Sequence, residues 1–281
     1  MRDKIKRLKK SLRVKAAYLL FVGPWNAAIV KLLRRFQKNP PVAVNRDSVI
    51  SEINVPAAVA KLEQNGFANG IQVSEEIVKE VVSQFVQRVG PLDDRRKNMQ
   101  CLSPHLYYPA VHKIAFNSQI VDVARGYFGV EPIIHSTRLS WALPDAPGQR
   151  KDVPFHFDVS DFRSLVLFVF LNDVDNEGGP HCVIEGTHKN KTLSEIFARQ
   201  LDPKEAQRRF GDRARLVTGP RGTAFFEDET AWHRRLSSNR PRLILNINHV
   251  MARPAPHHSG THFSCPSLQG RPAKARDCSE S

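Results

Sequence analysis

Between Pro132 and Val250 the chain consists of short apolar runs separated by Gly, Pro and Asp, and this texture limits the folds that it can adopt. Short runs rich in Val, Ile, Leu and Phe that end at turn-forming residues predict β-strands. Many such strands in succession favour an antiparallel sandwich or jelly roll. The predicted strands are Ile133–Leu143, Val153–Val159, Ser164–Leu171, His181–Ile184, Arg215–Val217, Gly222–Phe226 and Leu243–Val250.

Helical patterns precede and interrupt these strands, so we expect a mainly β protein with flanking helices. The strongest helix starts after Ser74, which is a good N-cap, with Glu75 and Glu76 in the first turn and an end at Gly90-Pro91. Such helices are expected to cover one face of a sheet. The other predicted helices are Ala57–Gln64, Ser118–Phe128 and a helical insert at Leu193–Phe210.

One domain from residue 57 to residue 252 can hold all of these elements, since β-rich domains routinely reach about 200–250 residues. We predict a linker at residues 41–56 and a disordered tail at residues 253–281, where large apolar side chains are few. The cysteines have no short paired spacing, which argues against a zinc knuckle or a disulfide framework and suits the cytoplasm. They are Cys101, Cys182, Cys265 and Cys278.

Residues 1–40 carry most of the charge of the chain: 12 Lys and Arg against one acid, a net charge of +11 out of +14. Their apolar stretch, Ala16–Val30, is shorter than the roughly 17–25 residues of a membrane-spanning helix and is interrupted by Gly23-Pro24. We therefore predict a basic amphipathic segment that lies peripherally on the anionic inner face of a membrane. The aromatic residues expected at that interface are Tyr18, Phe21 and Trp25.

Other interpretations of residues 1–40 stay open. The segment could be a secretory signal, an organellar transit peptide, a helix that packs on the domain, or a binder of polyanions. The long basic start and the lack of a clear cleavage site disfavour a secretory signal, and the lack of Ser enrichment disfavours a transit peptide. Outside this segment the net charge is only +3, which disfavours nucleic acid as a partner of the domain.

A His-x-Asp triplet lies within the second predicted strand. Because alternate side chains of a strand share a face, His156 and Asp158 are expected to point the same way. His233 supplies a third candidate ligand further along the chain. Two His and one carboxylate with open coordination positions are typical of non-haem Fe(II) oxygenases. The triplet alone is weak, because a strand histidine that bonds a neighbouring aspartate would have the same sequence.

The order of motifs around the triplet is more specific. A Gly-rich turn follows at residues 171–180, then Val183–Lys189 with the sequence VIEGTHK, and later Pro220–Phe226, His233 and Asn239–Arg242. In this combination the chain, from Ala57 to Ala252, resembles the phytanoyl-CoA dioxygenase family of Fe(II)/2-oxoglutarate-dependent oxygenases. The resemblance implies a double-stranded β-helix core, of the jelly-roll or cupin-like kind.

The resemblance also implies the cofactors and the residues that bind them. It makes His156, Asp158 and His233 the ligands of Fe(II), and it implies O2 and 2-oxoglutarate as co-substrates, the latter released as succinate and CO2. A basic residue at the start of the strand after the last ligand binds the far carboxylate of 2-oxoglutarate. Arg242 is the best match, since a guanidinium can bind a carboxylate through two hydrogen bonds. Arg240 is the competitor, although Pro241 places it in a turn.

Asp158 favours hydroxylation, because related halogenases have a small residue at that position. The expected substrate is a small or amphiphilic molecule (lipid, acyl chain or saccharide) that is oxidised at an unactivated C–H bond. Two other functions stay open: a non-catalytic, membrane-associated protein that binds metal or 2-oxoglutarate, and a nucleic-acid-modifying oxygenase. Residues expected to support the site are His181 and His188. Residues expected to line its pocket are Arg138, Ser140 and Trp141.

Overall fold

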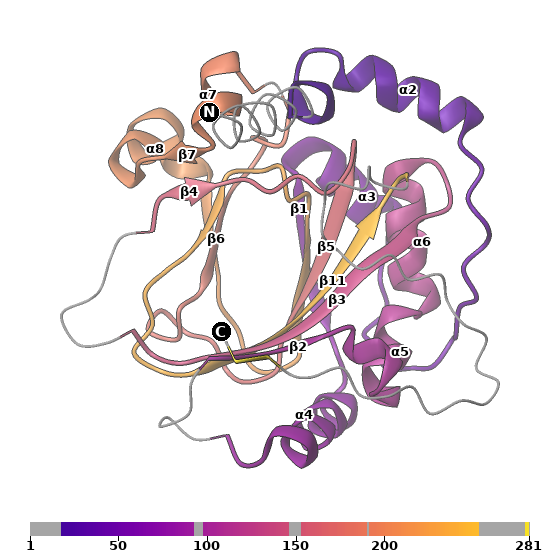
Figure 1. The fold of residues 1–281 in the computed structure, drawn as a ribbon, viewed down its shortest axis with the longest axis vertical. Helices are drawn as coiled ribbons and strands as arrows, with labels where there is room; N and C mark the ends of the chain where they lie inside the picture. Colours follow the sequence, from indigo (N-terminus) through magenta and orange to yellow (C-terminus); the bar gives the residue numbers. More distant parts are fainter. Residues whose placement is uncertain (1–17, 93–97, 146–152, 190, 253–278, 281) are drawn as a thin grey trace, which may run out of the picture.

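The computed structural model describes residues 18–92, 98–145, 153–189, 191–252 and 279–280, and folds them into two facing antiparallel sheets (Figure 1). The seven-stranded large sheet has the order β1(Phe67–Gln72), β9(Thr223–Glu227), β5(Ser164–Phe170), β11(Arg242–Val250), β3(Ile133–Ala142), β2(Met99–Leu102) and β12(Ser279–Glu280). The five-stranded small sheet has the order β7(Gln200–Leu201), β4(Phe155–His156), β10(His233–Arg235), β6(His181–Ile184) and β8(Ala214–Val217).

The barrel strands alternate between the two sheets along the chain. Strands β3, β5, β9 and β11 lie in the large sheet, and strands β4, β6, β8 and β10 lie in the small sheet. The chain therefore changes sheet from β3 to β4 to β5 to β6, and again from β8 to β9 to β10 to β11. This winding is the double-stranded β-helix, so the predicted fold class is confirmed.

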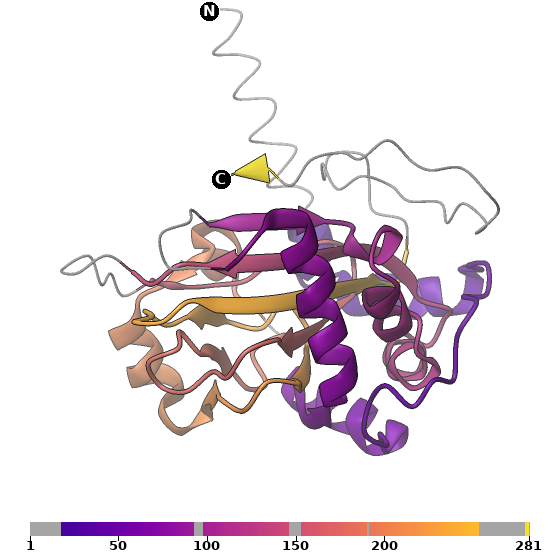
Figure 2. The same cartoon turned by 90° about the horizontal axis from the view of Figure 1, so that it is seen from below.

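Helices cover the outer face of the large sheet, and Figure 2 shows them gathered on one side of the strands. The side chains of Leu139 in β3 and of Leu245 and Ile247 in β11 are fully buried beneath them, in the largest apolar cluster. Burying one such side chain stabilises the fold by about 1.5–3 kcal/mol. The covering helices are α3(Val55–Asn65), α4(Glu75–Val89), α5(Pro109–Ala115) and α6(Ser118–Phe128).

The predicted helices are found close to their expected bounds because their capping residues could be recognised in the sequence. Ser74 Oγ accepts a hydrogen bond from the Ile77 amide at the start of α4, which ends before Gly90. Helix α6 has the predicted bounds and ends at Gly129, whose φ of 72° lies in the left-handed region. The predicted helical insert forms two helices, α7(Leu193–Ala198) and α8(Pro203–Phe210), with the edge strand β7 between them.

The seven predicted strands are all present, but one is much shorter than expected. Strand β4 contains only Phe155 and His156, so Asp158 lies beyond it rather than on it. Strands β1, β2, β7, β10 and β12 were not predicted. Strand β1 keeps its pairing with β9 through an irregularity between Ala68 and Ile71, at Asn69-Gly70.

The N-terminal segment packs on the domain from residue 18 onward, which corrects the prediction for two of its aromatic residues. Tyr18 and Phe21 are buried, not at a membrane interface. Tyr18 packs edge-on against Phe157, with 6.3 Å between ring centroids, and Phe21 packs against Phe162 at 4.6 Å. Both belong to the apolar cluster behind β4 and β10. Without them, aromatic side chains of that cluster would be exposed to solvent.

Helix α2(Asn26–Phe36) continues this packing. Its Arg34 side chain donates hydrogen bonds to the carbonyls of Tyr127 and Phe128 at the end of α6. Residues 41–56, the predicted linker, also contact the domain, with Val49 and Ile50 buried in the main cluster. No helix among the described residues has the length and apolar character needed to cross a membrane. The predicted disordered tail lies mostly outside the described residues, apart from β12.

Candidate metal centre

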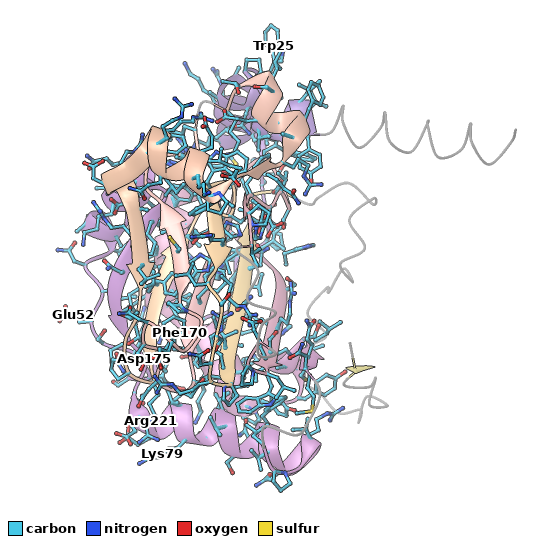
Figure 3. The ribbon with its side chains drawn as sticks, turned by 90° about the vertical axis from the view of Figure 1, so that its left-hand side faces the viewer. Trp25, Glu52, Lys79, Phe170, Asp175 and Arg221 are labelled. Carbon is cyan, nitrogen blue, oxygen red and sulfur yellow. The ribbon has the colours of Figure 1, made fainter. Side chains whose placement is uncertain are left out.

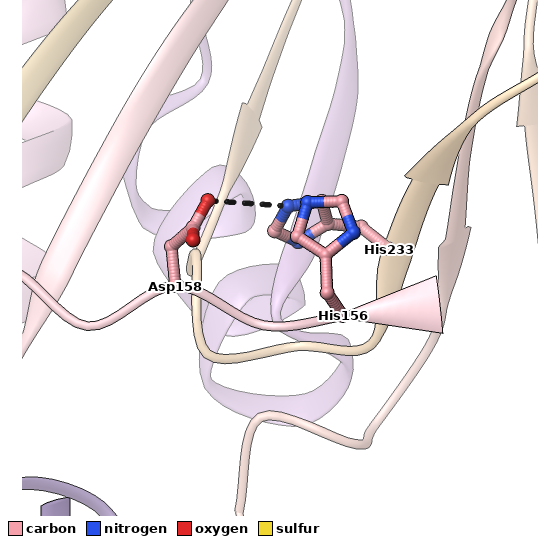
Figure 4. A group of neighbouring side chains, drawn as sticks. All are labelled: His156, Asp158 and His233. Atoms are coloured by element: carbon pink, nitrogen blue, oxygen red, sulfur yellow. Dashed lines mark ion pairs between the residues drawn. The ribbon is translucent and has the colours of Figure 1, made fainter. Parts of the chain in front are cut away.

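The structure brings the three predicted ligands together at one end of the barrel (Figure 4). One ligand atom from each of His156, Asp158 and His233 lies within 4.8 Å of the others. Asp158 Oδ2 is 3.6 Å from His233 Nε2, and the two imidazole rings are 4.5 Å apart between centroids. Asp158 is exposed, His156 is half-buried and His233 is buried, so the cluster opens to solvent on its carboxylate side.

Strand pairing in the small sheet sets these positions. His233 in β10 lies directly opposite His156 in β4, which fixes the distance between the two imidazoles. Asp158 follows β4 by two residues, and its amide donates a 2.8 Å hydrogen bond to the carbonyl of Glu229. The intervening Phe157 is fully buried and packs edge-on against Trp232 at 5.0 Å. Trp232 therefore packs behind the site.

A buried carboxylate holds His233 from behind. Glu227, at the end of β9 in the opposite sheet, has no exposed surface, and its Oε1 lies 2.9 Å from His233 Nδ1. Its Oε2 lies 2.5 Å from His181 Nε2. His233 Nδ1 also lies 3.1 Å from the Ala231 carbonyl, so Nδ1 faces Glu227 and the backbone while Nε2 faces Asp158. Carboxylates commonly orient metal-bound histidines by this contact.

The charges of this group determine the pKa of each member. Burial opposes ionisation of Glu227, but the neighbouring His181 and His233 outweigh it and lower the pKa of Glu227 to about 2. Burial likewise opposes a charge on His233, yet Glu227 and Asp158 together raise the pKa of His233 to about 10. The pKa of His156, in contrast, is lowered by burial and by the charge of His233. Glu227 and Asp158 thus hold positive charge where a metal ion would bind.

Glu227 was not predicted as a site residue. An acid that follows an apolar run is usually taken as the end of a strand, where its side chain would be exposed. Strand parity could have found it: Phe225 and Glu227 share a face of β9, and Phe225 packs inside the barrel against Phe168. His181, which was expected to support the site, does so by bonding Glu227 and stacking on His233 at 5.4 Å. His188 is buried among other residues, and its ring nitrogens have no partner among the described residues.

Arg242 is a buried cation that has no carboxylate partner among the described residues. Its side chain is 9% exposed, it donates a 2.6 Å hydrogen bond to the Gly179 carbonyl, and its Nε has no partner in the described part of the chain. Burial, and then the charge of Arg235, lowers the pKa of Arg242 to about 10. Arg240, the competitor, lies at the surface in an ion pair with Asp175. A buried guanidinium in this state is suited to a carboxylate ligand.

The turn that holds Arg242 requires glycine. Gly179 has a φ of 68°, and a Cβ atom on it would come within 2.8 Å of the Cβ of Ser238. A larger residue there would be strained and would displace the carbonyl that bonds Arg242. This gives the Gly-rich turn a specific role in the site.

Polar side chains line the inner face of β11 beyond Arg242. Asn246 and Asn248 are half-buried, and the Oδ1 of each lacks a partner among the described residues. Asn248 Nδ2 donates to Ser160 and to Glu229, a fully buried carboxyl whose pKa is raised to about 7, chiefly by burial. Unsatisfied amide oxygens on an inner face are suited to a polar ligand.

The residues predicted to line the pocket divide between two faces. Arg138 pairs with Asn246, and Ser140 pairs with Ile244, so both share the inner face with the site. Trp141 points the other way and packs in the helix-covered cluster, which corrects its predicted role. The reason is strand parity, which alternates side chains between faces of β3.

The chain is similar to one curated protein, the probable alpha-ketoglutarate-dependent hypophosphite dioxygenase of Stutzerimonas stutzeri. The two are 27% identical over 138 residues, which are 43% of this chain and 45% of the relative. The chain thus spans less than half the length of the curated relative that it matches. No family model matches the chain.

Solved structures with a similar fold include three with TM-scores above 0.5. EvdO2 from Micromonospora carbonacea var. aurantiaca, complexed with 2-oxoglutarate, has a TM-score of 0.54 and 15% identity over 74% of this chain and 97% of that chain. EctD from S. alaskensis, with 2-oxoglutarate and 5-hydroxyectoine, has a TM-score of 0.51 and 20% identity, and the match covers 75% of this chain and 80% of that chain. AviO1 from Streptomyces viridochromogenes Tue57 has a TM-score of 0.52 and 14% identity, and the match covers 73% of this chain and 99% of that chain. The chain shares the fold of these proteins.

Proposed function

We propose that this protein is an Fe(II)- and 2-oxoglutarate-dependent oxygenase that hydroxylates a small or amphiphilic substrate. The observation that carries the proposal is the pairing of two features inside one barrel. One is the His156, Asp158 and His233 cluster, and the other is Arg242, a buried guanidinium without a carboxylate partner among the described residues. The curated relative is named as alpha-ketoglutarate-dependent, and the structural neighbour EvdO2 is complexed with 2-oxoglutarate, which supports the same assignment.

The donor set fits Fe(II). Two imidazoles and one carboxylate leave coordination positions open, which is the ligand set of non-haem iron oxygenases. Bound iron would supply the activation of O2 that couples decarboxylation of 2-oxoglutarate to oxidation of a C–H bond. Glu227 holds the ring of His233 through Nδ1, so Nε2 is presented to the metal. Asp158 would supply the third ligand, and a carboxylate at this position favours hydroxylation over halogenation.

Arg242 is assigned to the far carboxylate of 2-oxoglutarate. Its planar fork can donate two parallel hydrogen bonds, and it stays charged at neutral pH even with its lowered pKa. Gly179 fixes one arm of the fork, so the guanidinium is oriented before the co-substrate arrives. His181 and Phe168, whose rings are 5.1 Å apart, provide apolar surface inside the barrel, on the side of the metal cluster.

The substrate class rests on the inner face of the large sheet. There Arg138 and Asn246 are polar, and Leu102, which pairs with Arg138 from β2, is 57% exposed. A substrate with both polar and apolar parts matches such a surface better than a purely apolar one. Nucleic acid is the less favoured substrate, since the basic charge is concentrated in residues 1–40.

The proposal is tested by 2-oxoglutarate binding and turnover. Fe(II)-loaded protein should bind 2-oxoglutarate without oxygen and release succinate when oxygen is admitted. Arg242→Ala should weaken 2-oxoglutarate binding about tenfold to a hundredfold, because a hydrogen bond to a charged group is worth roughly 1.5–3 kcal/mol. Iron affinity should be unchanged.

Arg240→Ala is the matched control, since it removes a neighbouring guanidinium that pairs at the surface with Asp175. Equal losses of 2-oxoglutarate affinity in both variants would contradict the assignment of Arg242. Binding of iron and 2-oxoglutarate without any succinate release, with all substrates in a metabolite and lipid library, would favour the non-catalytic alternative.

A further inference from the structure

Helix α2 is held to the domain by one face only. Val30 is its one buried residue, and Asn26 Nδ2 donates a 2.8 Å hydrogen bond to the Phe162 carbonyl. At the other end Arg34 bonds the Tyr127 and Phe128 carbonyls and pairs with Glu63 at 3.2 Å. These contacts at both ends fix the rotation of the helix about its axis, and so determine which side chains face away from the protein.

The outward face of α2 is apolar. Trp25, Leu32 and Phe36 are 69%, 59% and 66% exposed. Their spacing of seven and four residues, with Ala28 between the first two, places them on one side of a helix. Figure 3 shows Trp25 projecting from the end of the molecule, away from the body. Scattered exposed apolar residues need no explanation, but a stripe of large ones along a single helix indicates a surface that is covered in use.

Basic side chains run beside this stripe. Lys31 and Arg35 are exposed and lie one helical turn apart along its edge, and no carboxylate of the described residues pairs with either. Arg35 lies over the Phe36 ring at 5.6 Å. An apolar stripe bordered by unpaired basic residues is the composition of a helix that lies in the plane of an anionic lipid surface.

We propose that the outward face of α2, defined by Trp25, Leu32, Phe36, Lys31 and Arg35, docks on an anionic membrane surface. The apolar side chains enter the headgroup boundary, and the two basic residues contact lipid phosphates. A second copy of the chain is the less suitable occupant, because two such faces would bring four unpaired basic side chains together. The inference goes beyond the proposed chemistry and does not depend on it.

The docked helix would set the orientation of the metal centre. Figure 1 places α2 and β4 at the same end of the barrel. Phe21, in the helical residues 18–22 that precede α2, packs on Phe162, and Tyr18 packs on Phe157, which lies between the ligands His156 and Asp158. Arg199, after α7, covers the other side of Tyr18 at 4.2 Å. Through these contacts the lipid-facing helix is joined to the segment that carries His156 and Asp158.

The test is cosedimentation of the full chain with vesicles of phosphatidylcholine and phosphatidylserine, compared with phosphatidylcholine alone. The protein should bind the anionic vesicles preferentially and less as salt rises. The triple variant Trp25→Ser, Leu32→Ser, Phe36→Ser should lose at least about tenfold in affinity, and Lys31→Glu, Arg35→Glu should lose a comparable factor at low salt. Iron affinity of both variants should equal that of the unaltered protein.

Matched controls change the same kinds of residue elsewhere. Leu102→Ser with Leu216→Ser removes exposed apolar side chains of β2 and β8, and Arg46→Glu with Lys61→Glu reverses exposed charges outside α2. Both controls should bind vesicles normally. Unchanged vesicle binding by the triple variant would overturn the proposal, and so would self-association without lipid that the triple variant abolishes, since a second copy would then be the occupant. Normal thermal unfolding excludes loss of fold.

Discussion

The large and small sheets of this protein differ in strand length, in burial and in ionisable content. The large sheet has strands of up to ten residues, and helices bury its outer face. The small sheet places His156 and His233 on strands of two and three residues. Short strands are held by few ladder hydrogen bonds, so the ligands depend on contacts from the opposite sheet, chiefly Glu227 on His233. The two histidine ligands and the main apolar cluster therefore lie in different sheets, and substitutions should separate iron binding from stability.

The largest difference between the effect on iron binding and the effect on stability is expected for substitutions of the three ligands. His156→Ala, Asp158→Ala or His233→Ala should reduce Fe(II) affinity by more than the tenfold to hundredfold typical of residues that only orient a ligand, and should abolish turnover. The fold should persist most clearly in the His156 and Asp158 variants, because those side chains are half-buried and exposed. Calorimetric iron titration and circular dichroism measure the two effects. Wild-type iron affinity in all three variants would refute the ligand assignment.

A substitution in the large sheet should have the reverse effect, a loss of stability with little change in iron affinity. Leu245→Ala in β11 removes a fully buried side chain beneath the covering helices and should lower the free energy of unfolding by roughly 2–5 kcal/mol. Iron affinity, measured well below the unfolding midpoint, should stay within about threefold of wild type, because Leu245 faces away from the site. Leu32→Ala on exposed α2 is the control with the same chemical change. A large loss of iron affinity in Leu245→Ala would show that the sheets do not act separately.

The same contrast explains what the sequence could predict. Strand β11 and helix α6 were found within a residue or two, because long strands repeat with a clear period and Gly129 marks the helix end. The short strands β4 and β10 have no period to detect, and their geometry comes from the pairing of His233 with His156. The ligand hypothesis depended on the order of motifs, not on strand length. Glu227 was missed because it follows an apolar strand pattern and its partner His181 lies 46 residues away in the sequence.

A smaller effect is expected for the contact between the sheets. Glu227→Gln keeps the shape of the side chain but removes the charge facing His233 and His181, and should weaken Fe(II) binding about tenfold to a hundredfold. Glu177→Gln, at an exposed acid near the Gly-rich turn, is the control. The ligands remain in place, so binding should be weakened and not lost. Iron affinity equal to that of the control would mean that β10 alone positions His233.

The smallest expected effect concerns the proton on His233. Its pKa is raised from 6.5 to about 10, because Glu227 and Asp158 outweigh the effect of burial. The stabilisation that this proton gives the metal-free fold is complete below pH 6.5 and is lost as pH rises through about 10. Lys191, whose pKa burial lowers from 10.5 to about 7, has the opposite dependence, so unfolding curves would mix the two.

Proton release on metal binding isolates His233. Iron needs the neutral imidazole, so at about pH 8 its binding should release about one proton per chain, and affinity should rise with pH towards 10. Calorimetric titrations in two buffers with different ionisation enthalpies measure the released protons. The Glu227→Gln variant should release fewer protons. Without the Glu227 carboxylate the pKa of His233 is lower, so less of the ring is protonated before iron binds. No proton release from the unaltered protein would mean that Glu227 orients His233 without holding its charge.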